Sequence, residues 1–577
     1  MKLLKKIYLT KLPITNYQLL AILSLAVITR FGGLTWAFPY TPHPDEWNMA
    51  RAVTQLSWQD KLNPHFFAYG QFPLYLSYFS AVIYNLIPWI KISFINSQEA
   101  IFFLRFWSAL AGVGTVYLVY LISKKLTPTS HPRPTFHFSP PLLATLLVAL
   151  TPGLIQISHF GTTESLLSFF FLLILFLSFK IFEARKLKYF IFLGIVFGLA
   201  IGTKISALVF GFPVFITFII FITVTKFKTF ADFLKLFGKY LFALIFALIF
   251  TLISSPYLLL AFKESRGTLL YETSVATGQT LVFYTRQFID TKPILFQLQK
   301  ILPYALGAPI FILGILGFLV SLISLAPIKK KTQYSLITNY QLLITTLAFL
   351  FYFLSQAFLF TKWTRFMSPI FAFFPIFSGL FLGHLRHLRN LRYLSYLAVF
   401  FAVIPGIIFS SIYFSPDIRF TASEWIYKNI PAGSQILYDT GNVIDLPISR
   451  PNYSITPVSF DFYHLDENPE LFPKLLDSLE KSNFIIIPSR RIFANHLRLP
   501  RNFPLTTKYY QLLFSGKLGF TEIKIFRPFP QFQVSNFKFQ IDDEQSEETF
   551  TVFDHPTIRI YKKRTYLTAN DYENLFK

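Results

Sequence analysis

Eleven long apolar runs constrain the fold of this chain more than any other feature of its sequence. A helix needs about 20 residues to cross the roughly 30 Å of hydrocarbon in a bilayer, and each run is near that length and almost free of charge. Only 14% of the 577 residues are charged, whereas soluble domains carry about 25%. We therefore predict a polytopic α-helical membrane protein with spans near 14–36, 101–123, 141–159, 165–182, 188–203, 205–225, 240–260, 301–327, 335–360, 367–384 and 393–414.

Clusters of lysine and arginine between these runs predict the orientation of the spans, because such clusters favour the cytoplasmic side. The clusters are Lys2, Lys5, Lys6 and Lys11; Lys124 and Lys125; Arg185, Lys186 and Lys188; Lys226 and Lys228; Lys329 to Lys331; and Arg386, Arg389 and Arg392. With eleven spans all of them face the cytoplasm, provided that residues 72–90 lie along the membrane surface or re-enter it. We expect a multi-pass protein of the inner (cytoplasmic) membrane with a cytoplasmic N-terminus, and a first span that is an uncleaved anchor.

Charge and cysteine content exclude several classes of function. The net charge is +24, which in a soluble chain would suggest nucleic-acid binding. Here the excess lies in the short clusters between spans, so we expect no nucleic-acid partner. The chain has no cysteine, which excludes disulfides, thiolate metal sites and a cysteine nucleophile. His43, His65 and His159 match no compact metal-binding spacing, so we predict no metal site.

The composition changes after residue 414, where the chain becomes polar enough to fold in water. We predict a membrane domain over 1–414 and a small α/β domain over 415–577, which the odd number of spans places outside. Residues 423–439 (SEWIYKNIPAGSQILYD) are typical of a helix, a Pro-Gly turn and a strand. Further strands are expected at 483–489, 520–526 and 549–563, with a helix over 471–482. Residues 541–548 (IDDEQSEE) form a predicted acidic loop.

Polar residues gather at the predicted outer ends of the spans. They are Asp45 and Glu46 in the first outer loop (37–100), His159 and Glu164 between the third and fourth spans, and Lys204, Tyr257, Arg286, Lys362 and Arg365 in later outer segments. Charge beside hydrocarbon is costly and tends to be paired or functional. We therefore expect acids and cations from separate loops to converge on one membrane face.

Each of these residues also has a structural explanation. Asp45 and Glu46 could be solvated loop acids, and Lys204 or Arg365 could be anchors that extend to the interface. Glu164 could only begin a helix, because an acid in the first turn interacts favourably with the helix dipole. Arg105 is different, since it lies inside an apolar span. A guanidinium there needs an anionic partner, either a carboxylate or a bound phosphate.

The order of these segments resembles the GT-C superfamily of membrane glycosyltransferases. The resemblance is to the bacterial relatives of dolichyl-phosphate-mannose–protein mannosyltransferases and of the aminoarabinose transferases that modify lipid A. It covers about residues 14–415. The segments that carry it are HPDEWNMARAV from His43, NPHFFAYGQFPLYLSY (63–78), FLRFWSALAGVGTVYLVYLISKKL (103–126), HFGTTESLLSFFFLL (159–173), GLAIGTKISAL (198–208), SSPYLLL (254–260) and KWTRFMSPIFAFF (362–374). Glu164 stands where the family more usually has Asp, and the WWDYG signature of oligosaccharyltransferases is absent.

The resemblance implies a polyprenyl-phosphate-linked sugar as donor and a single inverting displacement on the outer face. Asp45 would act as the general base, and Glu46 and Glu164 would orient the acceptor or the basic residues. The candidates to bind the donor phosphate are Arg105, Lys204, Lys362 and Arg365, and candidate substrate contacts are His43, His159, Tyr257 and Arg286. No cofactor is expected. Members of the family differ in their use of divalent metal, and we predict no metal here. The sugar, and whether the acceptor is a protein, a glycan or a lipid, stay open.

Two other classes of function compete with a transferase. A transporter or lipid flippase would also carry charged residues within a multi-spanning bundle. Such proteins usually show paired halves, with charges near the bilayer midplane. In this chain the charges lie at one face and no half-to-half repeat is found, which favours the enzyme. A binding or assembly protein that works through its C-terminal domain is the third alternative, and it would have no need of both the acidic pair and the outer cations.

Overall fold

The computed structural model describes residues 14–86, 95–127, 139–224, 227, 229–325, 333–387, 391–439, 446–448, 453–530, 532–534 and 537–577. The chain forms two compact units. The helical unit comprises residues 1–34, 45–277 and 292–410, and the C-terminal unit comprises 35–44, 278–291 and 411–577. The N-terminal basic cluster, Lys226, Lys228, Lys329 to Lys331, Arg389 and the end of the predicted surface segment (87–90) lie outside the described residues.

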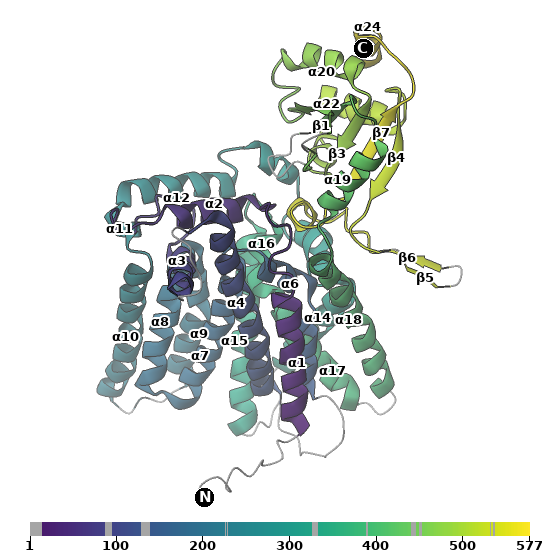
Figure 1. The fold of residues 1–577 in the computed structure, drawn as a ribbon. Coiled ribbons are helices and arrows are strands. Elements are labelled where there is room, and N and C mark those ends of the chain that lie inside the picture. The colour runs from purple at the N-terminus through teal and green to yellow at the C-terminus, as the bar shows by residue number, and fades with distance from the viewer. Residues whose placement is uncertain are drawn as a thin grey trace, which may run out of the picture. The chain divides into compact units, whose positions relative to one another are not determined.

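The helical unit is built almost entirely of apolar helices (Figure 1). Their bounds are α1 (Ile14–Phe31), α2 (Pro44–Gln55), α3 (Phe72–Asn85), α4 (Ser97–Leu126), α5 (Pro140–Ala149), α6 (Pro152–His159), α7 (Glu164–Ala184), α8 (Leu187–Thr203), η1 (Ile205–Gly211), α9 (Phe212–Val224), α10 (Phe230–Ser254), α11 (Tyr257–Leu260), α12 (Phe262–Thr277), η3 (Gln297–Ile301), α13 (Leu302–Ala305), α14 (Ala308–Leu325), α15 (Gln333–Ala357), α16 (Thr364–Phe371), α17 (Phe373–His387) and α18 (Arg392–Phe414). In Figure 1, α2 and α12 run across one end of this bundle, and α1 begins at the opposite end.

The predicted class, a multi-spanning helical membrane protein with a small sheet domain at its C-terminal end, is confirmed. Within the described residues seven helices are long and apolar enough to cross a membrane, or nine if the bent pairs α5–α6 and α16–α17 each form one span. Two shorter apolar helices, Tyr17–Phe31 and Leu187–Thr203, coincide with the other two predicted runs. The count of eleven stays a prediction.

Three glycines let α8 and α10 approach closely. A Cβ at Gly194 would lie 2.3 Å from the Ala243 carbonyl oxygen, and one at Gly198 would lie 2.5 Å from that of Ala247. Gly202, one turn further on, allows no Cβ for the same reason, because it would meet the Ser254 hydroxyl at 2.0 Å. Small residues four apart are the usual means of close helix packing in membranes. This packing fixes the end of α8, where Lys204 follows.

The C-terminal unit is an α/β fold around a five-stranded sheet of order β2-β1-β3-β7-β4. Strands β1, β2 and β3 are parallel, and β7 and β4 are antiparallel to their neighbours. Its elements are η2 (Phe283–Phe288), α19 (Ile418–Asn429), β1 (Gln435–Asp439), β2 (Thr456–Phe460), α20 (Leu471–Lys481), β3 (Phe484–Ile487), α21 (Phe493–His496), α22 (Pro504–Phe514), β4 (Phe520–Phe526), β5 (Phe532–Val534), β6 (Phe537–Phe539), α23 (Glu548–Thr551), β7 (Ile558–Lys563) and α24 (Ala569–Phe576). Two hydrophobic clusters, one around Leu475 and one around Ile426, form its core.

One prediction for this unit is wrong in part. The predicted strand over 549–563 is confirmed for 558–563, where β7 lies, but its beginning belongs to a short helix, α23, followed by a turn. The predicted acidic loop over 541–548 is a loop up to the start of α23, although its Asp543, Glu547 and Glu548 are buried. Two of these carboxylates form ion pairs with buried basic residues. Asp543 pairs with His555, and Glu548 pairs with Arg491 at 2.7 Å. Charge alone could not reveal these distant partners.

The buried His555 predicts a pH-dependent stability for this unit. Its Nε2 lies 2.9 Å from Asp543, and its Nδ1 contacts Asp554. Burial alone would lower the pKa of His555, but the two carboxylates outweigh it and raise that pKa to about 10. Because this pKa is higher in the folded state, protonated His555 stabilises the unit fully below the ordinary pKa near 6.5. That stabilisation is lost as the pH rises through about 10. We therefore expect the unfolding temperature of the parent to fall more steeply between pH 7 and 10 than that of His555→Gln. Circular dichroism melts over this pH range measure both temperatures, and an equal dependence on pH in the two proteins would contradict the prediction.

Candidate active site

Asp45 and Glu46 lie in the first turn of α2, which begins at Pro44. Proline is pre-organised for the first helical position, and acids there interact favourably with the helix dipole. The Asp45 carboxylate forms an ion pair with the Arg365 guanidinium, and both side chains are about one-fifth exposed. Arg365 is on α16, so the pair joins residues 320 positions apart in the chain. The Arg365 guanidinium also lies 4.9 Å from the ring of Trp363.

Glu46 faces the interior instead of the surface. Its two carboxylate oxygens accept hydrogen bonds from Arg105 Nε at 2.6 Å and Nη2 at 2.7 Å, and both side chains are fully buried. The Gly161 backbone N–H donates to the same carboxylate at 2.7 Å, and Arg105 Nη1 donates to the Leu34 carbonyl at 2.8 Å. The predicted anionic partner of Arg105 is therefore present within the protein, and it is a carboxylate.

Glu164 forms a third acid–cation pair. Its Oε1 lies 3.6 Å from the Lys204 ammonium, and the Thr163 hydroxyl donates to the same oxygen at 3.2 Å. The ammonium lies 5.0 Å from the ring of Tyr69 and 5.3 Å from the ring of Phe366. Phe366 is also 5.8 Å from the Arg365 guanidinium. One aromatic ring thus lies near the cations of both pairs, so the Asp45 and Glu164 pairs lie together.

A cavity of about 270 Å³ adjoins this cluster at Tyr69. Its mostly apolar wall comes from the loop residues 67–70 and from α8, η1, α11 and α12, and Arg266 and Glu272 on α12 supply charge. Burial raises the pKa of Glu272, and nearby Lys204 opposes that effect. Glu272 was not among the residues predicted from the sequence, although an acid on a mostly polar helix between apolar runs could have indicated it.

Three further candidates contact backbone carbonyl oxygens: Lys362, Tyr257 and His159. Lys362 donates to the Phe360 carbonyl at 2.9 Å, and burial lowers its pKa. The Tyr257 hydroxyl donates to the Lys61 carbonyl at 2.8 Å. Both ring nitrogens of His159 lie within 2.9 Å of backbone carbonyl oxygens, those of Ile155 and Gly32. These three residues brace segments of the helical unit.

The remaining two candidates, His43 and Arg286, belong to the C-terminal unit. The His43 ring packs against Phe553 with centroids 4.4 Å apart. Arg286 donates to the Tyr463 carbonyl at 2.6 Å and pairs with Glu467. Among the described residues no group of three or more His, Asp or Glu side chains is arranged to hold a metal ion.

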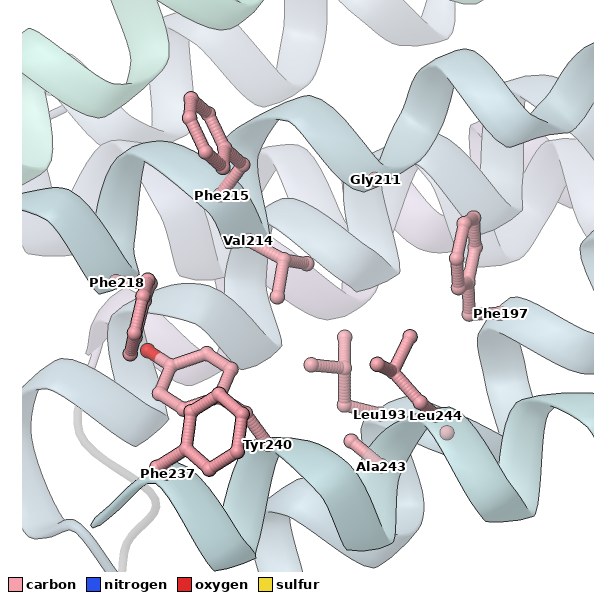
Figure 2. A pocket seen from close by; sticks show the side chains of 11 residues that line it. Leu193, Phe197, Gly211, Val214, Phe215, Phe218, Phe237, Tyr240, Ala243 and Leu244 are labelled. Atoms are coloured by element: carbon pink, nitrogen blue, oxygen red, sulfur yellow. The ribbon is translucent and has the colours of Figure 1, made fainter. Parts of the chain in front are cut away.

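A second pocket of about 280 Å³ lies between α8, α9 and α10 (Figure 2). Its wall is almost wholly apolar, and Figure 2 shows the rings of Phe218, Phe237 and Tyr240 on one side and Phe197 on the other. Phe197 is one helical turn from Ile201, which lines the first cavity. Residues four apart share one face of a helix, so the two hollows follow the same face of α8.

The sequence of residues 85–259 matches the family model described as dolichyl-phosphate-mannose-protein mannosyltransferase. The putative mannosyltransferase YkcB of Bacillus subtilis (strain 168) is 32% identical over 123 residues. That match covers 20% of this chain and only 16% of the relative. The predicted resemblance to the dolichyl-phosphate-mannose–protein mannosyltransferases is confirmed over residues 85–259, a segment that contains Arg105, Glu164 and Lys204.

Two solved structures are also similar at low sequence identity. One is the archaeal oligosaccharyltransferase AglB from Archaeoglobus fulgidus in complex with an inhibitory peptide and a dolichol-phosphate. It is 14% identical, and the match covers 86% of this chain and 72% of that chain with a TM-score of 0.47. ArnT from Cupriavidus metallidurans in the apo state is 12% identical with a TM-score of 0.45, covering 84% of this chain and 95% of that one.

Proposed function

We propose that this protein transfers a monosaccharide from a polyprenyl-phosphate donor to a hydroxyl acceptor, by inverting displacement at the outer face of the membrane. The observation that carries the proposal is the convergence of Asp45–Arg365 and Glu164–Lys204 on Phe366, beside a mostly apolar cavity. Two cations beside two acids suit a reaction that needs one base and one anion-binding site. The family match over 85–259 supports the same chemistry.

In the proposed reaction Asp45 takes the proton of the acceptor hydroxyl as its oxygen bonds to the anomeric carbon. The bond between that carbon and the phosphate oxygen breaks, and polyprenyl phosphate leaves with the electron pair. The leaving phosphate gains negative charge, which Arg365 and Lys204 stabilise through charge-assisted hydrogen bonds. Donor phosphate would compete for Arg365 with the Asp45 carboxylate, and its binding would free Asp45 to accept a proton.

The remaining acids and cations of the cluster position these groups. Glu46 and Arg105 satisfy one another in the interior, and Glu46 directly follows Asp45, so the buried pair fixes the start of α2. Glu164 holds the Lys204 ammonium toward the same side as Arg365. Glu272 and Arg266 line the cavity and keep its end near Lys204 charged.

We place the donor's prenyl chain in the cavity and the second pocket, which lie along α8. A phosphate beside Lys204 would put the first isoprene units in the cavity lined by Ile201, and the next ones would reach the pocket lined by Phe197 (Figure 2). The helices around that pocket expose large apolar side chains such as Leu241 and Leu248. A chain of pure hydrocarbon fits this wall, whereas a free nucleotide sugar would leave it unfilled.

The orientation proposed for the active protein has the N-terminus in the cytoplasm and the C-terminal unit outside. The basic clusters between predicted spans support this orientation. In this orientation Asp45 lies on the side where polyprenyl-linked sugars are consumed. The acceptor is then an envelope component with a free hydroxyl.

Loss of the Arg365 guanidinium should weaken donor binding. We expect Arg365→Ala to raise the Kd for polyprenyl phosphate about 10-fold or more, because a hydrogen bond to a charged group contributes about 1.5–3 kcal/mol. Quenching of tryptophan fluorescence by polyprenyl phosphate measures this. Arg389→Ala, a change in a predicted cytoplasmic cluster, is the charge-matched control. Parental affinity in Arg365→Ala would mean that this guanidinium does not bind the donor.

A further inference from the structure

Lys204 directly follows α8, and two other segments of the helical unit cap the carbonyl groups that precede it. The Gly202 carbonyl accepts a hydrogen bond from the Ser255 hydroxyl at 3.0 Å, and the Thr203 carbonyl accepts one from the Gly70 N–H at 3.0 Å. The last carbonyls of a helix have no partner within it, so buried ones need a donor from elsewhere. The backbone conformation just before Lys204 therefore depends on two segments that are distant in the sequence.

Gln71 connects these two segments. Its backbone N–H donates to the Ser255 hydroxyl oxygen at 2.6 Å, and its side-chain oxygen accepts a hydrogen bond from the Tyr257 N–H at 3.0 Å. Pro256 disfavours a helical conformation in the residue before it, so α10 ends at Ser254 and Ser255 lies outside the helix. Gln71 and Ser255 are both fully buried. Loss of the Ser255 hydroxyl would therefore leave buried polar groups without their partner.

The hydrogen bond between Gly70 and Thr203 also brings an aromatic ring beside the Lys204 ammonium. Tyr69 directly precedes Gly70, and the ammonium lies 5.0 Å from the Tyr69 ring. The backbone approach is close, because a Cβ at Gly70 would lie 2.0 Å from the Gly202 carbonyl oxygen. The backbone segments that carry Tyr69 and Lys204 are thus in direct contact, and the same buried hydrogen bonds hold both.

We propose that Ser255 and Gln71 are positioning residues for Lys204, which hold its ammonium where the donor phosphate binds. This inference rests on the proposed function, in which Lys204 stabilises the leaving phosphate. Neither residue touches the donor: Ser255 acts through the Gly202 carbonyl, and Gln71 acts through the Ser255 hydroxyl. Their effect should therefore be confined to the recognition of phosphate, and it should require the Lys204 side chain.

The test is a double-mutant cycle between Ser255→Ala and Lys204→Ala in the full-length protein. Quenching of tryptophan fluorescence measures the Kd for polyprenyl phosphate and, separately, for the uncharged polyprenol of the same length. Ser255→Ala should raise the Kd for polyprenyl phosphate about 10-fold, which is within the usual range for coupling inside one hydrogen-bond network. It should leave the Kd for polyprenol unchanged, and it should change neither Kd further when Lys204 is already alanine.

Ser321→Ala is the matched control. Ser321 is a buried serine of α14 whose hydroxyl donates to the Gly317 carbonyl of its own helix at 2.8 Å. The variant loses the same hydroxyl and should keep the parental Kd for both ligands. If Ser255→Ala fails to fold, Ser255→Cys takes its place in the cycle, because a thiol has nearly the same shape and is a weaker hydrogen-bond donor.

Three outcomes would overturn the proposal. Parental affinity for polyprenyl phosphate in the Ser255 variant would mean that this hydroxyl does not position Lys204. Equal losses of polyprenol and polyprenyl phosphate binding would mean that Ser255 only maintains the cavity. An undiminished effect in the Lys204→Ala background would mean that Ser255 acts through another group. Failure of the proposed function is distinguishable, because Lys204→Ala alone would then bind polyprenyl phosphate as tightly as the parent.

Discussion

Asp45→Asn should reduce sugar transfer by about 10²–10⁴-fold, the usual contribution of a general base. The amide has nearly the same shape as the carboxylate but cannot accept a proton. Folding should be little affected, because the Asp45–Arg365 pair is partly exposed and such pairs contribute about 0–1 kcal/mol. Single-turnover transfer from labelled polyprenyl-phosphate mannose measures the rate, and the unfolding temperature checks the fold.

Glu264→Gln is the matched control for this variant. Glu264 is an exposed acid at the start of α12, on the same unit as Asp45. Its amide variant makes the same change of charge and should transfer sugar at the parental rate. A turnover of Asp45→Asn close to that of Glu264→Gln would remove Asp45 from the mechanism.

Breaking the buried pair between Glu46 and Arg105 should destabilise the helical unit more than any other single change considered. We expect Arg105→Met to cost about 3–5 kcal/mol of unfolding free energy, because it leaves the Glu46 carboxylate buried without a cation. The Gly161 N–H would still donate a hydrogen bond to that charge. Thermal unfolding of the purified protein in detergent would show the loss.

The double variant Glu46→Leu with Arg105→Met provides the control. Removing both charges leaves no unpaired ion, so the double variant should unfold nearer the parental temperature than Arg105→Met does. If Arg105→Met is as stable as the parent, the pair does not hold the start of α2. If the double variant is less stable than the single one, packing and not charge is responsible.

The apolar runs and the basic clusters between them predict which loops share a membrane face. Asp45, Glu164, Lys204 and Arg365 were among the residues selected on that ground and from the family resemblance, and their side chains form two neighbouring pairs. The partner of each residue could not be predicted. For Arg105 both a carboxylate and the donor phosphate were open as partners, and its guanidinium contacts the carboxylate of Glu46. Whether a carboxylate or a ligand satisfies a buried cation depends on helix rotation, which composition does not reveal.

The C-terminal unit shows a different limit. Its helices α19 and α20 and its strands β1, β3 and β4 were predicted from local patterns. The recruitment of residues 35–44 and 278–291 was not, because it depends on contacts between segments hundreds of residues apart. His43 and Arg286 were therefore taken as candidate substrate contacts, although their side chains pack within this unit.

The measurement that tests the central claim most directly is the fate of the sugar–phosphate bond in a polyprenyl-phosphate mannose labelled in the sugar. Purified protein in liposomes, supplied with washed envelope material, should cleave that bond and attach the label to the acceptor with inverted anomeric configuration. Asp45→Asn liposomes should leave the donor intact. Movement of unbroken donor between leaflets would instead indicate a flippase, and retention of the bond by the parent protein would contradict the account.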